Sequence, residues 1–194
     1  MSGTSAGRLV VVSGPSGVGK STVVREVLHL TGEKVHLSVS ATTRQPRPGE
    51  VDGVHYHFLS PEEFERRSQA GEFLETAEVF GRGYWYGTLW SEVTSSLEAG
   101  RWVILEIDVQ GALAVMERYP DAITIFVRTR TLADLEQRLR RRGTETEEAI
   151  QRRLSAANNE LALADRYRRQ VINDNIQAAA KEIVEILQNE GLSL

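Results

Sequence analysis

Cysteine is absent from the 194 residues, which excludes a disulfide framework, a thiolate zinc site and a cysteine nucleophile. No apolar run approaches the ~20 residues that a bilayer span needs, which excludes a membrane protein. An excess of positive charge is also missing. The formal net charge of −4 argues against a protein that coats nucleic acid, although local basic clusters can still hold anions. Apolar residues make up 41% and charged residues 26%, the balance of one soluble globular domain with at most small inserted subdomains.

The first eight residues are small and polar, and we expect residues 1–8 to form a flexible tail. They lack the apolar stretch of a secretory signal, and Ser2 occupies the position where myristoylation needs glycine. These observations predict a cytoplasmic protein.

Apolar, β-branched runs alternate with helical patterns along most of the chain. Such runs are typical of strands buried on both faces of a parallel sheet, and they occupy residues 9–13, 35–39, 103–108, 122–127 and 170–173. Between them, apolar residues three or four apart predict helices, one of which carries Ile150, Leu154, Ala157 and Leu161. This order predicts an α/β fold with a doubly wound parallel sheet and right-handed crossovers.

Residues 40–90 break this alternation and predict a small inserted subdomain of mixed α+β structure. Two prolines exclude helix from residues 44–50, and a short alternating strand is expected at residues 54–59. Ser60 followed by Pro61 and two acids has the pattern of a helix start.

Residues 14–21, Gly-Pro-Ser-Gly-Val-Gly-Lys-Ser, match the phosphate-binding pattern G-x-x-x-x-G-K-[ST] in full. The glycines let backbone N–H groups point at phosphate oxygens, and the helix that follows adds its positive dipole end. An ordinary glycine-rich turn is the alternative, but the buried strand before the motif and the helix after it favour a P-loop. Lys20 would reach the β- and γ-phosphates, and the Ser21 hydroxyl would bind Mg²⁺. The predicted ATP-binding residues here are Gly14, Pro15, Ser16, Gly17, Val18, Gly19, Lys20, Ser21 and Thr22.

A basic run at residues 138–143 is the second unusual segment. A solvated helix end would also explain it, since arginine is favourable in a last turn. With the phosphate loop upstream, we interpret residues 138–159 as a short arginine-rich lid. The predicted nucleotide-binding core comprises the residues outside the tail, the insert and the lid, namely 9–39, 91–137 and 160–194.

Arg44 and Arg47 lie three residues apart on a segment that proline stiffens. Guanidinium forks suit a phosphate dianion, because each donates two parallel hydrogen bonds, yet these two alone would be read as ordinary surface arginines. The run 38–50 with residues 52–58, however, resembles the monophosphate-binding segment of guanylate kinases. Further segments that resemble this family are residues 71–75, 86–88, 106–111 and 142–148. The resemblance extends from about Arg8 to about Leu187.

The resemblance to guanylate kinases implies roles for individual residues. The implied GMP-binding set is Ser40, Arg44, Arg47, Tyr56, Glu75, Tyr86, Thr88 and Asp108. Within it, the arginines and tyrosines hold the phosphate, the carboxylates meet guanine, and the hydroxyls complete base recognition. On the triphosphate side, the resemblance implies the lid residues Arg138, Arg142 and Arg153 and the adenine contact Asn173.

The chemistry of guanine agrees with these implied roles. Its N1–H and N2–H₂ donors suit carboxylate acceptors such as Glu75 and Asp108, and its O6 suits a hydroxyl donor such as Ser40 or Thr88. Adenine reverses this pattern, so AMP would leave a buried carboxylate facing a lone pair. A site of this kind discriminates by ~10⁴ or more.

Two positions depart from the family pattern. The loop before Gly87 is two residues longer than usual, so both Tyr84 and Tyr86 are candidates for the phosphate contact; Tyr86 is preferred because it adjoins Gly87 and Thr88. Glu106 stands where many members have aspartate. Beside the phosphate loop it is expected to orient a water bound to Mg²⁺.

These features predict ATP-dependent phosphorylation of GMP, and we expect also of dGMP, with Mg²⁺ as cofactor. The expected catalytic residues, which bring two polyanions together, are Lys20, Arg44, Arg142 and Arg153. ATP and GMP are the expected partners, without nucleic acid or membrane, and a monomer or small homo-oligomer is expected. Two alternatives stay open: a non-catalytic guanylate-kinase-like interaction module, and a P-loop kinase of another phosphorylated acceptor.

Overall fold

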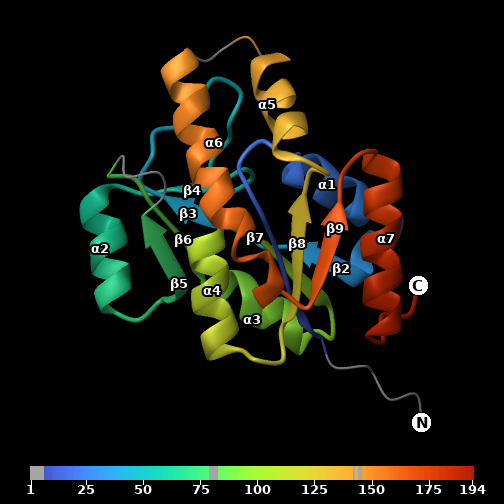
Figure 1. Cartoon of the computed structure of the whole chain (residues 1–194). Coiled ribbons are helices and arrows are strands. Elements are labelled where there is room, and N and C mark those ends of the chain that lie inside the picture. Colours follow the sequence, from blue (N-terminus) through green and yellow to red (C-terminus); the bar gives the residue numbers. More distant parts are fainter. Residues whose placement is uncertain (1–6, 79–82, 142, 144–145) are drawn as a thin grey trace.

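The computed structural model of the protein describes residues 7–78, 83–141, 143 and 146–194. These residues form a five-stranded sheet and a four-stranded sheet with helices around them (Figure 1). Most of the tail expected at residues 1–8 lies outside the described residues.

The five-stranded sheet is parallel throughout and forms the centre of the molecule. In spatial order its strands are β2 (Val35–Leu37), β7 (Trp102–Glu106), β1 (Leu9–Ser13), β8 (Ile123–Arg128) and β9 (Arg169–Ile172). Each one begins within a residue of an apolar run predicted as a strand. The predicted α/β fold with a doubly wound parallel sheet is therefore confirmed.

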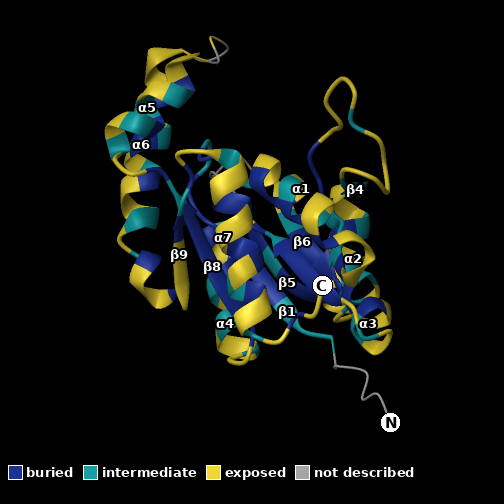
Figure 2. Ribbon diagram, turned by 90° about the vertical axis from the view of Figure 1, so that its right-hand side faces the viewer, coloured by how far each residue is buried: buried dark blue, intermediate teal, exposed yellow. Residues whose placement is uncertain are grey.

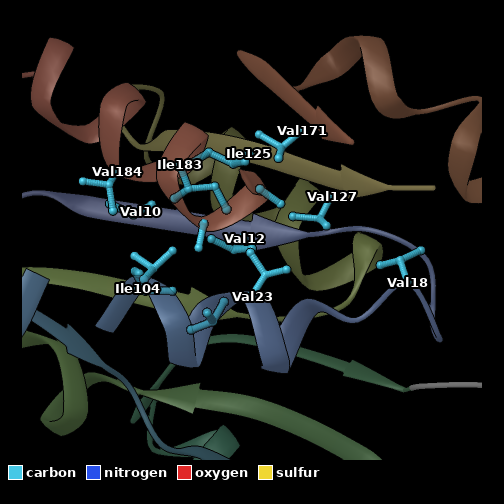
Figure 3. Close-up of a cluster of buried hydrophobic side chains, with 14 of the residues drawn as sticks. Val10, Val12, Val18, Val23, Ile104, Ile125, Val127, Val171, Ile183 and Val184 are labelled. Atoms are coloured by element: carbon cyan, nitrogen blue, oxygen red, sulfur yellow. The ribbon is translucent and has the colours of Figure 1, made fainter. Parts of the chain in front are cut away.

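Helices cover both faces of this sheet. They are α1 (Lys20–Thr31) and α7 (Ile176–Asn189) on one face, with α3 (Trp90–Glu98) and α4 (Val109–Arg118) on the other. Side chains alternate along β1: Val10 and Val12 pack toward α1 and α7 (Figure 3), and Val11 packs toward α3 and α4. Short 3₁₀ helices span Gly32–Lys34 and Ala164–Arg166. None of the helices in the described part of the chain is long and apolar enough to cross a bilayer.

The four-stranded sheet belongs to the predicted insert. Its spatial order is β4 (His57–Phe58), β3 (Ser40–Thr42), β6 (Trp85–Leu89) and β5 (Phe73–Glu78). Helix α2 (Pro61–Gln69) packs beside it through Phe64, which stacks on Phe73 at a ring distance of 4.5 Å. The predicted helix start is confirmed, because the Ser60 hydroxyl accepts the Glu63 N–H at 3.1 Å.

The strand predicted at residues 54–59 is wrong in extent, since only β4 is a strand there. Gly53 has a positive φ of 72° and donates its N–H to Tyr56 O at 2.8 Å, which closes a tight loop. The Asp52 carboxylate accepts the Phe58 N–H at 2.8 Å and fixes the end of that loop. Val54 therefore points into solvent with 65% of its surface exposed. The alternation of apolar and polar residues that predicted a strand here belongs to a turn instead.

Two further helices stand together beyond the arrowheads of β8 and β9 (Figure 1). They are α5 (Leu132–Arg141) and α6 (Glu147–Leu161), which include most of the predicted lid. Thr146 caps α6 by accepting the Ala149 N–H at 3.3 Å. Their inward residues join the central core, whereas their outer faces are exposed (Figure 2).

Ile125→Ala should lower the free energy of unfolding by about 3 kcal/mol, because Ile125 is fully buried in the middle of β8 and its loss leaves a cavity. Urea denaturation measures the change. Leu30→Ala, at a position with 38% exposure in α1, is the control and should change stability by less than about 0.5 kcal/mol. Equal losses in both variants would contradict the burial described here.

Candidate active site

The loop between β1 and α1 has the backbone of a phosphate cradle. Gly14, Gly17 and Gly19 have positive φ angles of 138°, 98° and 92°. A Cβ on Gly14 would lie 2.0 Å from Val127 O, and one on Gly17 would lie 2.7 Å from Leu139 Cδ2, so both positions require glycine. Gly19 caps α1 without a side-chain acceptor, and the first turn of α1 holds no acidic residue. The N–H groups of Lys20 and Ser21, which precede the bonded N–H of Thr22, are thus left for an anionic ligand.

Lys20 lies over this loop and donates to Gly14 O at 2.5 Å and Pro15 O at 3.1 Å. Burial lowers the pKa of Lys20, while the negative charges of Glu106, Glu160 and Asp108 act in the opposite direction. The ammonium therefore sits among carboxylates that favour its charged form.

Ser21 and Glu106 meet because β1 and β7 pair in parallel, with Val12 opposite Glu106. The Ser21 hydroxyl donates to Glu106 Oε1 at 2.5 Å. The pairing of strands thus places the hydroxyl and the carboxylate predicted for Mg²⁺ in contact.

Two predicted residues, Asn173 and Arg138, lie behind the loop. Asn173 donates from Nδ2 to Val18 O at 2.8 Å, and Arg138 donates to Val18 O at 3.1 Å and also to Asn173 O. Asn173 is 2% exposed, and its Oδ1 has no hydrogen-bond partner in the described part of the chain. These contacts tie the P-loop to α5 and to the end of β9. The predicted Arg142 lies outside the described residues.

On the second sheet, three predicted residues form one row across neighbouring strands. Thr88 on β6 is directly opposite Ser40 on β3 and Glu75 on β5, so the three side chains share one face. A register shift between Phe73 and Glu75 marks a bulge in β5, a device that re-aims a side chain next to a functional site.

Thr88, one of the hydroxyls predicted for base recognition, contacts a neighbouring carboxylate. Its side chain is fully buried, and its hydroxyl donates to Glu75 Oε1 at 2.8 Å. A hydroxyl has one proton to donate, so in this structure Thr88 orients the carboxylate, and Ser40 is the hydroxyl that faces the cavity.

Asp108 caps α4 and lies close to Glu75. Its Oδ1 accepts the N–H groups of Gln110 at 2.7 Å and Gly111 at 3.1 Å. A Cβ on Gly111 would lie 2.6 Å from Glu75 Oε2, so the missing side chain makes room for that carboxylate. Burial raises the pKa of Glu75 to about 7, with a further contribution from the charge of Asp108, while the Thr88 hydrogen bond opposes the shift.

Arg44 is the centre of a second group. Its Nε donates to the Tyr86 hydroxyl at 3.2 Å, and its guanidinium carbon lies 5.4 Å from the Tyr56 ring centre. Both terminal nitrogens bind Glu50, each at 2.9 Å. Of the two candidate tyrosines, Tyr86 adjoins the arginine, whereas Tyr84 is 41% exposed.

A cavity of about 470 Å³ joins these groups. The predicted residues that line it are Gly14, Ser16, Gly17, Gly19, Lys20, Ser21, Thr22, Ser40, Arg44, Arg47, Tyr56, Glu75, Tyr86, Glu106, Asp108 and Arg153. Predicted residues in the described part of the chain that do not line it are Pro15, Val18, Thr88, Arg138 and Asn173.

Five lining residues were missed by sequence reasoning, namely Arg25, Glu50, Gly87, Ile107 and Glu160. For Glu160 a signal existed: it follows Arg153 by seven residues, two helical turns, and so falls on the same face of α6. For Glu50 the signal was its place three residues after Arg47 in a Pro-Gly turn.

Comparison with known proteins gives a consistent result. The family model "Guanylate kinase" matches residues 6–190. The chain belongs to the guanylate kinase family. A guanylate kinase of Rhodopirellula baltica is 50% identical over 95% of this chain and 88% of its own length, and one of Gloeobacter violaceus is 50% identical over 94% and 88%. The crystal structure of guanylate kinase from Anaplasma phagocytophilum matches with a TM-score of 0.78 at 33% identity, covering 97% of this chain and 88% of that one.

This guanylate kinase family member should show a pH-dependent stability that Glu75 causes. The folded-state pKa of about 7 exceeds the ordinary value of 4.5, so the folded state binds more protons than the unfolded state between these values. That stabilisation is present below pH 4.5 and is lost as the pH rises through 7. Compared with the wild type, Glu75→Gln should therefore gain on the order of 2 kcal/mol between pH 5 and pH 8.

Urea denaturation at the two pH values measures the gain. Glu98→Gln, an exposed substitution on α3 with the same charge change, should show no such gain. A constant difference between Glu75→Gln and the wild type would contradict the raised pKa.

Proposed function

We propose that this chain transfers the γ-phosphoryl group of ATP to GMP, giving ADP and GDP. The observation that carries the proposal is the cavity itself: Lys20 on the P-loop forms one wall, and Arg44, just after β3, and Glu75 on β5 form another. A P-loop alone indicates a nucleoside triphosphate. The opposing arginine and carboxylate indicate an acceptor that has both a phosphate and a hydrogen-bonding base.

The donor nucleotide would place its phosphates in the P-loop. The N–H groups at the start of α1 would then donate to phosphate oxygens. The Lys20 ammonium would exchange the carbonyl oxygens of Gly14 and Pro15 for phosphate oxygens. Asn173 Oδ1, which has no partner among the residues that the structure describes, is an acceptor suited to the adenine N6–H₂ donor. Arg153, which lines the cavity from α6, would add positive charge near the transferred group.

The acceptor base would lie against the carboxylates. Glu75 comes from β5 and Asp108 from the N-cap of α4, yet both line the cavity, and their oxygens suit the N1–H and N2–H₂ donors of guanine. Ser40 lines the same region and supplies a hydroxyl donor for O6. AMP would face these carboxylates with an acceptor nitrogen, which disfavours it.

The reaction needs positioning more than it needs a base. An oxygen of the GMP phosphate, ionised near neutral pH, attacks the γ-phosphorus of ATP; the new P–O bond forms as the β–γ bridging P–O bond breaks, and ADP leaves with the electron pair. Lys20 and Arg44 would neutralise the charges that oppose this approach. Closure of α5 and α6 over the cavity would exclude water, which otherwise would hydrolyse ATP.

Mg²⁺ fits the pair formed by Ser21 and Glu106, because a hard cation prefers oxygen ligands and keeps several waters. The Ser21 hydroxyl would bind the ion, and Glu106 would hold one of its waters. When bound, the ion neutralises charge on the β- and γ-phosphates. Cytoplasmic location, monomeric or small oligomeric state and use of dGMP stay predictions.

A coupled assay of ADP release tests the proposed function. The wild-type chain should turn over with ATP, Mg²⁺ and GMP, and AMP should be used at least ~10⁴-fold less efficiently. Lys20→Met should lower kcat about 100-fold or more, because it removes the charge at the transferred phosphate. A folded wild type that shows no turnover with GMP would favour a non-catalytic interaction module, and turnover with a different phosphorylated acceptor would favour another kinase.

Gly111→Ala should raise KM for GMP about tenfold while KM for ATP stays within about twofold. The added Cβ would lie 2.6 Å from Glu75 Oε2 and displace that carboxylate from the base. Alanine is also better than glycine inside a helix by about 1 kcal/mol, so we expect no loss of stability. A weaker affinity for GMP at unchanged stability would show that the variant disturbs the base site and not the fold as a whole. Steady-state kinetics and thermal denaturation measure them.

Gln110→Ala is the matched control for this variant, because it changes the neighbouring exposed position of α4. It should leave both KM values within about twofold of the wild type. An unchanged KM for GMP in Gly111→Ala would show that Glu75 does not recognise the base.

A further inference from the structure

Arg44 is bound by a carboxylate that sequence reasoning did not include in the site. Glu50 Oε2 accepts from Arg44 Nη1 and Glu50 Oε1 accepts from Arg44 Nη2, each at 2.9 Å. This is the two-pronged geometry with which arginine binds carboxylates and phosphates. The same guanidinium is the one proposed to hold the GMP phosphate, so the role of Glu50 bears directly on acceptor binding.

A count of donors shows what is left for a phosphate. Guanidinium has five N–H groups. Four of them are engaged: Nε by Tyr86, Nη1 by Glu50 and by Gln45 O at 2.7 Å, and Nη2 by Glu50. The second N–H of Nη2 has no partner among the described residues. The Tyr86 hydroxyl accepts from Nε and so keeps its own proton to donate.

Glu50 is held by its own stretch of chain independently of Arg44. Arg47, Pro48, Gly49 and Glu50 have the pattern of a type II turn, with Gly49 at a φ of 87°. The Glu50 N–H donates to Arg47 O at 3.0 Å, and the Arg47 N–H donates back to Glu50 Oε2 at 2.7 Å. The carboxylate is therefore fixed by the turn that carries both it and Arg47.

Burial favours a lasting ion pair over a temporary one. The side chains of Arg44 and Glu50 are only 10% and 18% exposed, and the guanidinium also faces the rings of Tyr56 and Phe58 at 5.4 and 5.8 Å. The pair raises the pKa of Arg44 and lowers that of Glu50, so both stay charged at neutral pH. Expelling Glu50 in favour of phosphate would leave a half-enclosed carboxylate beside an incoming dianion, which is unfavourable.

We propose that Glu50 is a positioning residue for the acceptor phosphate. It holds the Arg44 guanidinium so that the spare Nη2–H, together with the Tyr86 hydroxyl, faces the phosphate, and it orders the turn that presents Arg47. This inference rests on the proposed function, because it assumes that the acceptor is GMP. The opposite interpretation is that Glu50 occupies the phosphate position and competes with GMP.

The substitution Glu50→Gln separates these two interpretations. If Glu50 positions Arg44, the variant should weaken GMP binding about ten- to hundredfold, because hydrogen bonds to charged groups are among the strongest. If Glu50 competes with phosphate, the variant should bind GMP more tightly. Calorimetric titration with GMP in the absence of ATP measures the dissociation constant, and steady-state kinetics measure kcat and both KM values.

Guanosine distinguishes a phosphate effect from a general loss of structure, because it carries the base without the phosphate. In Glu50→Gln, the inhibition constant of guanosine and KM for ATP should stay within about twofold of the wild type, so that the loss is confined to GMP. Glu50→Asp keeps the carboxylate and should lose less GMP affinity than Glu50→Gln. Glu98→Gln, exposed on α3, is the charge-matched control and should bind GMP like the wild type.

Three results would overturn the proposal: tighter or unchanged GMP binding by Glu50→Gln, equal losses of affinity for GMP and guanosine, or a loss in Glu50→Asp as large as that in Glu50→Gln. If the glutamine variant does not fold, Glu50→Asp is compared with the wild type instead, and tighter or unchanged GMP binding by Glu50→Asp would overturn the proposal. A wild type that binds GMP but transfers no phosphoryl group would refute the proposed function, while the binding measurements would still test the role of Glu50.

Discussion

The parallel pairing of β1 with β7 and β8 is the constraint on which the rest of the molecule depends. β1 is buried on both faces, so the neighbouring strands fix the point from which the P-loop leaves its carboxyl end. The register that sets Val12 opposite Glu106 also brings Ser21 to Glu106, and Asp108, two residues further on, caps α4. Ligands bind at this edge of open parallel sheets for that geometric reason.

The second sheet contributes through cross-strand neighbours. Thr88 on its central strand is flanked by Ser40 and Glu75, and the bulge in β5 aims Glu75 at the N-terminus of α4. The carboxylates of Glu75 on β5 and of Asp108 at the N-cap of α4 therefore lie together. Their proximity and burial explain the raised pKa of Glu75, and they also create a site that favours a ligand with several N–H donors.

Sequence reasoning succeeded where one local signal decides the structure. The P-loop glycines, the Ser60 cap and the apolar runs each depend on interactions within a few residues or on burial of a whole strand. It failed at residues 54–59, because alternating residues also occur in a turn that Asp52 and Gly53 close. It also did not foresee the hydrogen bond from Thr88 to Glu75, since that contact depends on a pairing between two strands.

The amino-acid sequence by itself determined the fold class, the phosphate loop and the family, because these follow from contiguous motifs and from the period of apolar residues. The family resemblance also indicated most residues that line the cavity. Only the tertiary structure decided how the charges pair: Glu50 with Arg44, Thr88 with Glu75, and Arg138 with the backbone behind the loop. The contacts of Thr88 and Arg138 join elements far apart in the sequence, and the pair of Arg44 and Glu50 depends on how one loop turns, so the spacing of residues along the chain did not by itself reveal these partners.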